Sequence, residues 1–468
     1  MTARVLLPTV CLIAALGWAA RGHGEVATMT DAGRDASGSR MTRRQMLTGV
    51  GAAAVGGLVV GGVGGYVIGG GDEGTTTSGG GGGEPIKIGS ASPVSGAYAG
   101  DGQEMTRGQE LAVEAINGNG GVLGRSLELV VADVEDLAPE KMVNAARRLT
   151  NEGVAAVFSG YTSTSSTEYD VYAEYGAPMF HLNTFQPNAD YVADNQIPNI
   201  YHSCPTEVWY GPGFILFMQR LIDGGMWQPS SESVAVITSN DPYSITIAQT
   251  VREGIQSLGW EVKLYEQVTA PLTEWGPVLA KVRADPPGLI FHADYIPGDL
   301  ASFQQQFRSD PTQSLMYQQY GPSIPEYLEL AGQDADGVIW STVIGTLPDE
   351  IGQAFKDAYR EKFGAEAGLS QAGGQYDLVH VWAQAAAMAG DPADFEQVNV
   401  NLKRTIYRGV SGTYRYKPGE LTAIPYPDAV SDPSLGMPHL TFQIQNQQQV
   451  LVDPQPYVQG EFQLPEWL

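Results

Sequence analysis

The sequence predicts an α/β fold with two lobes that enclose a cleft. Short apolar runs typical of buried strands alternate with segments of helical periodicity, and this alternation predicts parallel sheets with helices on both faces. The alternation is repeated in the second half of the body, with a weak internal similarity between segments 131–158 and 268–292. The 384 residues after position 84 are also long for one core, because domains usually contain about 100–200 residues.

In the first half, turn residues separate the expected strands from the expected helices. Leu111, Ala112, Ala115 and Ile116 recur at helical spacing, and the glycine-rich segment 117–124 ends that helix. A proline at position 139 suits the first turn of the next helix. Strands are therefore expected at 85–92, 127–132, 154–158 and 178–182, and helices at 105–116 and 139–150.

The second half repeats this organisation. Strands are expected at 234–238, 261–267, 289–292 and 315–318, and helices at 244–258, 274–282 and 296–307. The C-terminal segment 454–468 contains Tyr457, Phe462 and Trp467, and we expect it to lie extended with these aromatic side chains on one lobe.

The first 84 residues predict an export signal and a tether. Arg43 and Arg44 precede a weakly apolar, glycine-rich run, as in a twin-arginine signal, which we place at 41–71. The alternative is a membrane anchor, since residues 49–70 can span a bilayer core of about 30 Å. Segment 1–40 is interpreted as a leader, or as a mis-start upstream of Met41, and segment 72–84 as a Gly/Ser/Thr-rich linker. The protein is expected in the periplasm or at the cell surface, either released or tethered to the membrane.

The composition excludes several classes of function. A net charge of −26 and a pI near 4.5 argue against nucleic acid as a partner, because its phosphates would be repelled. Cys11 lies in the leader and Cys204 in the body, so no disulfide framework is expected. The six histidines are scattered, and the sequence has no zinc-ligand spacing, phosphate-binding loop, dinucleotide motif or nucleophile elbow. No metal, cofactor or catalytic residue is predicted.

A hydroxyl-rich turn follows the apolar run 154–158. Residues 162–166 read Thr-Ser-Thr-Ser-Ser and stand just before a helix. Free main-chain N–H groups and side-chain oxygens at such a position suit the carboxylate or carbonyl group of a small ligand. The alternative is an ordinary N-cap, which Ser or Thr supplies at many helices.

The residues that follow the other expected strands are also polar or aromatic. Ligands of open α/β sheets lie at the carboxyl ends of the strands, and aromatic walls with a few fixed polar groups are typical of a small-molecule site. The post-strand residues include Tyr98, Asn183, Phe185, Asp241, Tyr243, Asp294, Tyr295, Gln319 and Tyr320. His292 and Asp294 could form a catalytic pair, but no nucleophile motif accompanies them, and a histidine packed at a strand end is favoured.

Several motifs occur in a fixed order from about residue 85 to the C-terminus. They are segment 88–103, Gly108 with segment 117–124, Asp241-Pro-Tyr-Ser, Trp275-Gly-Pro-Val-Leu-Ala-Lys-Val, Gln375-Tyr-Asp-Leu-Val-His-Val-Trp, Gly409-Val-Ser-Gly and segment 443–452. Each motif is weak alone, but the ordered set resembles the type I periplasmic solute-binding proteins of ABC transporters, in the Leu/Ile/Val-, amide- and urea-binding group. The resemblance implies two Rossmann-like lobes joined by three crossovers, which close on a ligand and deliver it to an ABC permease.

The resemblance also implies a ligand-binding set drawn from both lobes. The hydroxyl-rich turn would bind the carboxylate or carbonyl end of the ligand, and the ends of the other strands would complete the pocket. Together with Tyr98 from the first post-strand loop, the predicted ligand-binding residues are Ser163, Thr164, Ser165, Asn183, Phe185, Tyr243, Asp294, Tyr295, Gln319 and Tyr320.

The end of strand 315–318 departs from the amino-acid-binding pattern. Amino-acid binders of this family usually place an acidic residue there to hold the ammonium group, whereas this chain has Gln319 and Tyr320. Asp294 could substitute. If it does not, the ammonium group lacks a countercharge, and burying an unpaired cation costs several kcal/mol. A neutral amide or urea then becomes the expected ligand, and Asn183, which carries a donor and an acceptor, fits an amide group.

The expected function is that of an extracytoplasmic substrate-binding protein of an ABC importer, which binds a branched-chain amino acid or a related small amide or urea by hinge closure. Its expected partners are this small-molecule ligand and the permease and ATPase subunits of the transporter. A ligand sensor of the same fold is the alternative, and an enzyme is not expected. The first lobe is predicted to comprise residues 85–205 and 322–440, and the second lobe residues 206–321 and 441–468.

Overall fold

The computed structural model of the protein describes residues 83–427 and 429–468. The chain divides into two units, Met1–Gly71 and Asp72–Leu468, and all described residues belong to the second. The leader, the export signal or anchor and most of the linker, expected at 1–40, 41–71 and 72–84, lie outside the described residues. No helix in the described part of the chain is long and apolar enough to cross a membrane.

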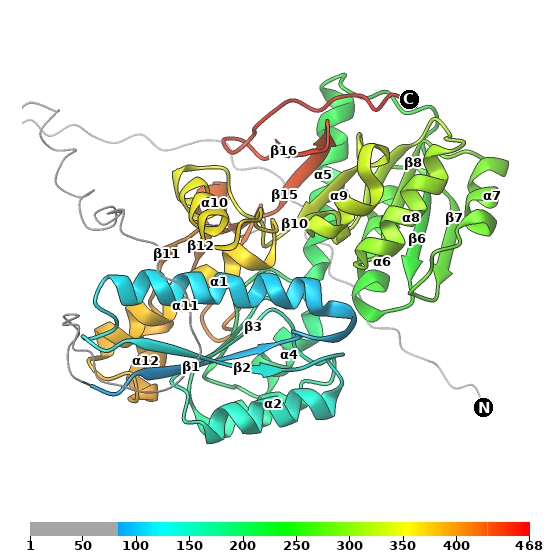
Figure 1. Ribbon diagram of the computed structural model, residues 1–468. Coiled ribbons are helices and arrows are strands. Elements are labelled where there is room, and N and C mark those ends of the chain that lie inside the picture. The colour runs from blue at the N-terminus through cyan, green and yellow to red at the C-terminus, as the bar shows by residue number, and fades with distance from the viewer. Residues whose placement is uncertain (1–82, 428) are drawn as a thin grey trace, which may run out of the picture. The chain divides into compact units, whose positions relative to one another are not determined.

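The first lobe is built on a parallel sheet of five strands, in the order β2-β1-β3-β4-β5 (Figure 1). The strands are β1 (Ile86–Ser92), β2 (Leu127–Asp133), β3 (Val157–Ser159), β4 (Met179–His181) and β5 (Ile200–His202). One face is covered by α1 (Ala99–Gly118) and α11 (Gln371–Ala389), and the other by α2 (Pro139–Asn151) and α3 (Thr167–Tyr175). The remaining helices of this lobe are α4 (Gln186–Asp194), α10 (Glu350–Phe363) and α12 (Phe395–Leu402).

The residue pattern of β1 explains why this sheet is covered on both faces. Ile86 and Ile88 belong to a core that includes Ala112 of α1. Ala91 belongs instead to the core with Leu149 of α2. Side chains alternate between the faces of a strand, so this one strand contributes to both layers.

The second lobe is built on a sheet of seven strands, in the order β16-β15-β10-β9-β8-β6-β7. The strands are β6 (Ser233–Ser239), β7 (Glu261–Val268), β8 (Leu289–Ala293), β9 (Leu315–Gln318), β10 (Ile339–Thr342), β15 (Leu440–Gln445) and β16 (Gln448–Asp453). β15 runs antiparallel to β10 and β16, and the other pairs are parallel.

Helices cover both faces of this second sheet, which is again explained by alternation along a strand. Val234 and Val236 of β6 share a core with α5 (Tyr210–Asp223) and α6 (Pro242–Ser257). Ala235 and Ile237 share a core with the helices on the other face. Those helices are α7 (Gly276–Ala284), α8 (Pro297–Arg308) and α9 (Pro325–Ala331).

Short elements lie between these main ones. Two-residue strands pair as β11 (Tyr407–Arg408) with β12 (Thr413–Tyr414), and as β13 (Pro425–Tyr426) with β14 (Met437–Pro438). Single 3-10 turns occur at η1 (Gly96–Tyr98), η2 (Glu207–Trp209), η3 (Gly321–Ser323), η4 (Gly332–Ala335) and η5 (Pro433–Leu435).

The predicted α/β fold is confirmed, and one predicted lobe boundary is corrected. Every predicted strand is present with its ends shifted by at most a few residues; β3, for example, begins at Val157 rather than at residue 154. The boundary expected at residue 322 is wrong, because β10 pairs with β9 and β15 in the second sheet. The chain therefore leaves the second sheet only after Thr342, because the backbone groups of this buried strand are paired there.

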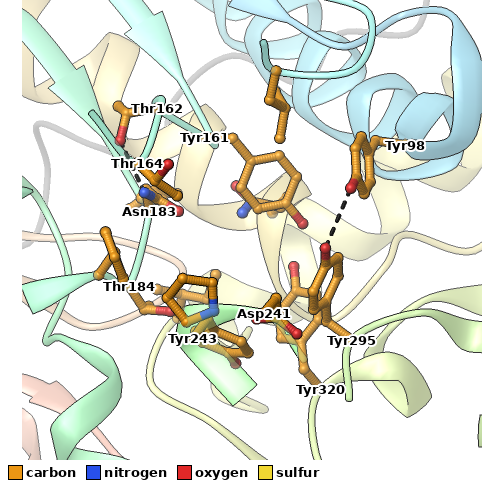
Figure 2. A pocket seen from close by; sticks show the side chains of 16 residues that line it. Tyr98, Tyr161, Thr162, Thr164, Asn183, Thr184, Asp241, Tyr243, Tyr295 and Tyr320 are labelled. Carbon is orange, nitrogen blue, oxygen red and sulfur yellow. Dashed lines mark hydrogen bonds between the residues drawn. The ribbon is translucent and has the colours of Figure 1, made fainter. Parts of the chain in front are cut away.

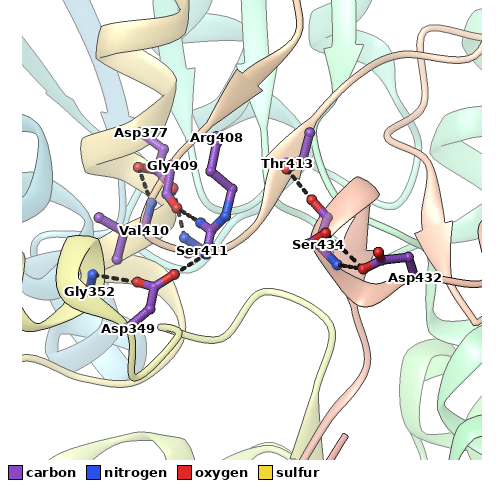
Figure 3. Close-up of polar contacts among 10 residues, drawn as sticks. All are labelled: Asp349, Gly352, Asp377, Arg408, Gly409, Val410, Ser411, Thr413, Asp432 and Ser434. Carbon is purple, nitrogen blue, oxygen red and sulfur yellow. Dashed lines mark hydrogen bonds and ion pairs between the residues drawn. The ribbon is translucent and has the colours of Figure 1, made fainter. Parts of the chain in front are cut away.

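The crossover that follows β10 is anchored to the first lobe by a polar cluster (Figure 3). Asp377 of α11 accepts hydrogen bonds from the N–H groups of Val410 (2.7 Å) and Ser411 (2.9 Å). The Leu347 N–H of the crossover donates to the carbonyl oxygen of Val410 at 3.0 Å. Burial raises the pKa of Asp377 to about 7, although the two N–H groups favour its charged form. An ion pair in the same cluster links the start of α10 to β11.

The C-terminal segment lies against the second lobe, as the sequence predicts. Trp467 is buried against Phe307 of α8, and the guanidinium carbon of Arg308 lies 4.8 Å from the centre of its ring. The indole N–H donates to the carbonyl oxygen of Ser314 at 2.8 Å. These contacts fix the tail without any helix or strand after β16 in the described chain.

Candidate functional site

A cavity of about 140 Å³ lies between the two lobes, where strands of both sheets reach their carboxyl ends. Its lining consists of Tyr98, Leu137, Tyr161, Thr162, Thr164, Leu182, Asn183, Thr184, Phe185, Asp241, Pro242, Tyr243, Tyr295, Tyr320, Ile344 and Gln371. Figure 2 shows hydroxyl and amide side chains gathered on one side and phenol rings on the other.

Seven of the eleven predicted ligand-binding residues line this cavity. They are Tyr98, Thr164, Asn183, Phe185, Tyr243, Tyr295 and Tyr320. The other four, Ser163, Ser165, Asp294 and Gln319, lie outside the lining. The structure therefore brings residues from both lobes to one cavity, and their role in ligand binding stays a prediction.

Ser163 is engaged by an acidic residue of the helix that follows it. Glu168 of α3 is fully buried and accepts hydrogen bonds from both the N–H and the hydroxyl group of Ser163, the first at 2.7 Å. Carboxylates are favoured near a helix N-terminus, where N–H groups without intrahelical partners carry partial positive charge. The chain thus supplies its own anion here. Ser163 is engaged by Glu168 and is not the N-cap of α3, which is Ser166 and has no side-chain capping hydrogen bond.

The neighbouring hydroxyl groups differ in where they point. Ser165 is exposed, and its hydroxyl contacts those of Ser163 and Thr167, each at 3.2 Å. Thr164 lines the cavity, as does Thr184 after β4. Neither the Thr164 nor the Thr184 hydroxyl forms a hydrogen bond with the residues that the structure describes, so both are available to a ligand.

Asn183 is oriented by a network within the first lobe. Its Nδ2 group donates to Thr162 Oγ1 and to Asn188 Oδ1, each at 2.8 Å. Asn188 Nδ2 donates to the carbonyl oxygen of Ser163 at 3.0 Å, and a carbonyl can only accept, so the orientation of both amides is determined. The Asn183 Oδ1 atom accepts no hydrogen bond from any described residue. Asn183 therefore offers a ligand an acceptor, and the expectation that it also offers a donor is corrected.

Tyrosines form the opposite wall and connect the lobes. The hydroxyl groups of Tyr98 and Tyr295 are 3.2 Å apart and share a hydrogen bond, and their rings stack with centroids at 6.1 Å. Tyr161 of the first lobe and Tyr320 of the second both donate to Asp101 Oδ2, the latter at 3.1 Å. Burial raises the pKa of Asp101 to about 6, an effect that the two phenol donors partly offset.

Gln319 positions a cavity residue and does not line the cavity itself. It is buried, its Nε2 group donates to the Tyr243 hydroxyl at 3.2 Å, and its Oε1 atom accepts from Tyr317. Burial raises the pKa of Tyr243 well above its usual value, so this phenol is neutral. Because the Tyr243 oxygen accepts from Gln319, its own O–H can donate to a ligand.

Asp294 is committed to the backbone of its own loop. Its Oδ1 atom accepts from the N–H groups of Tyr295 (2.6 Å) and Ile296 (3.0 Å), and the side chain is fully buried. Burial raises its pKa to about 7. Asp294 therefore stabilises the turn before α8 through Oδ1. Its Oδ2 atom has no hydrogen-bond partner among the described residues, and the side chain does not line the cavity, so its contact with a ligand stays a prediction.

His292 is a core residue, packed at the end of a strand as the sequence analysis favours. Its ring packs against Trp275 and Phe303, with centroids 4.8 and 4.6 Å away. Neither ring nitrogen has a partner among the described residues, and burial lowers its pKa to about 3. It does not line the cavity.

Asp241 lines the cavity, although the predicted ligand-binding set omits it. Its Oδ1 atom accepts from the Ser244 N–H at 2.9 Å, which caps α6, and its Oδ2 atom accepts from the Ser239 hydroxyl at 2.6 Å. The sequence signal for this cap is an Asp followed by Pro at the start of a helix. That the same carboxylate reaches the cavity depends on how the two lobes meet.

Other lining residues were also outside the predicted set. Tyr161, Thr162 and Thr184 are neighbours of predicted residues in the same loops, so the position of those loops was the available signal. Gln371 begins α11, far away in the sequence, and no local pattern indicates it. Gln371 is 2% exposed, and its Oε1 atom has no hydrogen-bond partner in the described chain.

The chemistry of the lining is suited to binding. The polar groups are phenols, hydroxyls, amides and one carboxylate, and the described lining contains no Cys, His, Lys or Arg. Within residues 83–427 and 429–468, no three His, Cys, Asp or Glu side chains are grouped so as to hold a metal ion. Such a set can orient a ligand by hydrogen bonds and aromatic contacts.

Two curated relatives are binding proteins for amino acids by name. A Leu/Ile/Val-binding protein homologue of Brucella abortus (strain 2308) is 27% identical over 224 residues, which are 47% of this chain and 55% of the relative. The chain thus matches about half the length of that relative. A leucine-, isoleucine-, valine-, threonine- and alanine-binding protein of Pseudomonas aeruginosa is 24% identical over 329 residues, 70% of this chain and 84% of the relative.

A solved structure and a family model give the broader relationship. The structure of a protein assigned to branched-chain amino acid ABC transport in Silicibacter pomeroyi is 37% identical, covers 82% of this chain and 100% of its own, and superposes with a TM-score of 0.76. These relatives are binding and transport proteins rather than enzymes. The family model described as periplasmic binding protein matches residues 85–422, which is most of the chain. This protein therefore belongs to the periplasmic binding protein family.

Proposed function

We propose that the protein is the extracytoplasmic substrate-binding subunit of an ABC importer, and that its ligand is a branched-chain amino acid or a related small amide or urea. The observation that carries the proposal is the cavity between the lobes, lined from strand ends of both sheets. Family membership and the names of the relatives support it. The export signal expected at 41–71 fits a location outside the cytoplasm, with permease and ATPase subunits as partners.

The size of the cavity supports a small ligand. A volume of about 140 Å³ is close to that of engineered cavities of about 150 Å³ that bind benzene. The side chains of leucine, isoleucine and valine are no larger than a benzene ring. Tyr98, Phe185 and Leu182 provide the apolar contacts that such a side chain requires.

The hydroxyl-rich side supports a polar end on the ligand. The hydroxyls of Thr164 and Thr184 and the O–H of Tyr243 are donors that can face a carboxylate or carbonyl oxygen. In this arrangement the first lobe captures the polar end, and the second lobe closes over the ligand by a hinge movement. The closed form is then the one that the permease recognises.

Ligand-dependent melting tests the proposal. We expect at least one of leucine, isoleucine, valine, short amides or urea to raise the melting temperature, since a ligand at about 100 times its Kd adds about 2.7 kcal/mol. Thr164→Ala should weaken this shift. Ser165→Ala is the matched control, because Ser165 lies in the same turn but outside the cavity lining, and it should leave the shift unchanged.

Uptake of the radiolabelled ligand by cells tests the transport role. Deletion of the gene should abolish high-affinity uptake, and the wild-type chain should restore it. Binding without any loss of uptake would favour a sensor of the same fold, and a lack of response to every compound would contradict the proposed ligand class.

A further inference from the structure

The acidic groups around the cavity differ in their access to it. Asp101, Glu168 and Asp294 are buried and do not line the cavity, although the Asp294 Oδ2 atom has no hydrogen-bond partner among the described residues. Asp241 is the one carboxylate that lines the cavity in the described chain, and no Lys or Arg lines it. A cation held in this cavity would therefore face Asp241 without a competing positive charge.

The carboxylate of Asp241 is held firmly and still has capacity to bind. The Ser244 N–H and the Ser239 hydroxyl each occupy one position on its two oxygens, at 2.9 and 2.6 Å. An ionised carboxylate offers about four acceptor positions, so about two remain for a ligand. Figure 2 shows Asp241 between the side chains of Tyr243 and Tyr295, whose rings are 6.1 Å apart at 81°. Phenol faces stabilise a nearby cation in addition to the carboxylate.

A second acceptor faces the same cavity from the first lobe. Both Nδ2 hydrogens of Asn183 are engaged by Thr162 and Asn188, so only its Oδ1 atom is available. An amide or carboxylate ligand that needed a donor from Asn183 would find none. A ligand with several N–H donors, by contrast, satisfies Asn183 as well as Asp241.

We propose that the cavity selects ligands that carry a protonated amine, and that Asp241 is the countercharge that determines this specificity. The inference rests on the proposed binding function and sharpens it, because it favours amino acids over neutral amides and urea. Asp241 follows β6, so the countercharge comes from a different strand end than β9, where Gln319 and Tyr320 stand. A ligand amine that moved from water into the closed cavity would otherwise lie there without a charged partner.

The test compares ligands with and without the amine on wild-type protein and on Asp241→Asn. Asparagine is as good an N-cap as aspartate, so this variant should keep α6 and remove only the charge. By isothermal titration, wild type should bind L-leucine at least about thirty-fold more tightly than 4-methylpentanoate, which lacks the amine. In Asp241→Asn, leucine should bind about thirty-fold more weakly or worse, while 4-methylpentanoate should bind as tightly as to wild type, or more tightly.

Asp394→Asn is the matched control. Asp394 caps α12 by accepting from the Gln397 N–H at 3.0 Å, in the same manner as Asp241 but away from the cavity, so leucine affinity should not change. Equal leucine affinity of wild type and Asp241→Asn would overturn the role of Asp241 while the binding function stands. Tighter binding of short amides or urea than of any amino acid would also overturn the role of Asp241 and leave the binding function standing. If wild type bound none of these compounds, the proposed ligand class itself would fail.

Discussion

At the scale of single residues, the carboxylate of Glu168 fixes the turn that leads into α3. It is fully buried, and its two oxygens accept the N–H and the hydroxyl hydrogen of Ser163. We expect Glu168→Gln to lower the free energy of unfolding by about 1–3 kcal/mol, because the new NH₂ group would face a donor and leave it unsatisfied. Urea denaturation followed by circular dichroism measures this loss.

Glu174→Gln provides the control for this prediction. Glu174 is an exposed residue of the same helix, so its substitution should change the free energy of unfolding by no more than about 0.5 kcal/mol. Equal stability of Glu168→Gln and wild type would mean that the buried carboxylate does not hold the turn.

At the scale of secondary-structure elements, the packing of α1 on α11 depends on a glycine. A Cβ atom on Gly108 would lie 2.2 Å from the carbonyl oxygen of Ala372 in α11. We expect Gly108→Ala to destabilise the protein by about 1–3 kcal/mol, because the two helices would have to separate. Denaturant titration reports the change in the free energy of unfolding.

Gly118, in the same helix, should respond in the opposite direction. A Cβ atom there would meet nothing within 4 Å. Alanine costs less backbone entropy than glycine in a helix, so Gly118→Ala should raise stability by up to about 1 kcal/mol. A similar loss of stability in both variants would contradict the packing argument, since it would point to helix propensity or to another general effect of alanine.

The main elements could be predicted from the sequence because their signals are local. Apolar runs of strand length, helical spacing and turn residues all act within about ten residues, and every predicted strand is present. β10 was placed in the wrong lobe because strand partners are not a local property. Its short buried run, Ile339–Thr342, pairs with β9 and β15, and β15 is about a hundred residues further along the chain.

At the scale of the whole molecule, the contact between the lobes should depend on pH through Asp101. Tyr320 of the second lobe donates to this carboxylate, and burial raises its pKa from 3.8 to about 6. A protonated Asp101 therefore favours the joined lobes. This stabilisation of the lobe contact by protonated Asp101 is fully present below about pH 4 and is lost as the pH rises through 6. It requires that water reaches the carboxylate when the lobes open.

Small-angle X-ray scattering without ligand should show this dependence. We expect a smaller radius of gyration at pH 5 than at pH 7.5 for wild type, and a weaker dependence for Asp101→Asn, which has no charge to lose. Identical pH profiles for the two proteins would assign the effect to other groups, such as Glu104, whose charge also raises the pKa of Asp101.

The sequence by itself determined the fold class, and it predicted a site at the strand ends together with seven of the sixteen residues that line the cavity. These follow from periodicity and from the rule that parallel strands present their carboxyl ends at one edge of the sheet. It also indicated the family, through motifs whose order runs along the whole body.

Only the tertiary structure decided which polar groups face the ligand. Asp241 and Asp294 both follow strands of the second lobe, and nothing local separates them as cavity residues. In the fold, the N–H groups of Tyr295 and Ile296 hold Asp294 in its own turn, while the cap of α6 leaves Asp241 in the lining. Asn183 likewise became an acceptor because Asn188, fixed by the Ser163 carbonyl, occupies one of its hydrogens. The direction of a side chain depends on the donors that surround it in space, and the sequence lists those donors without stating which of them meet.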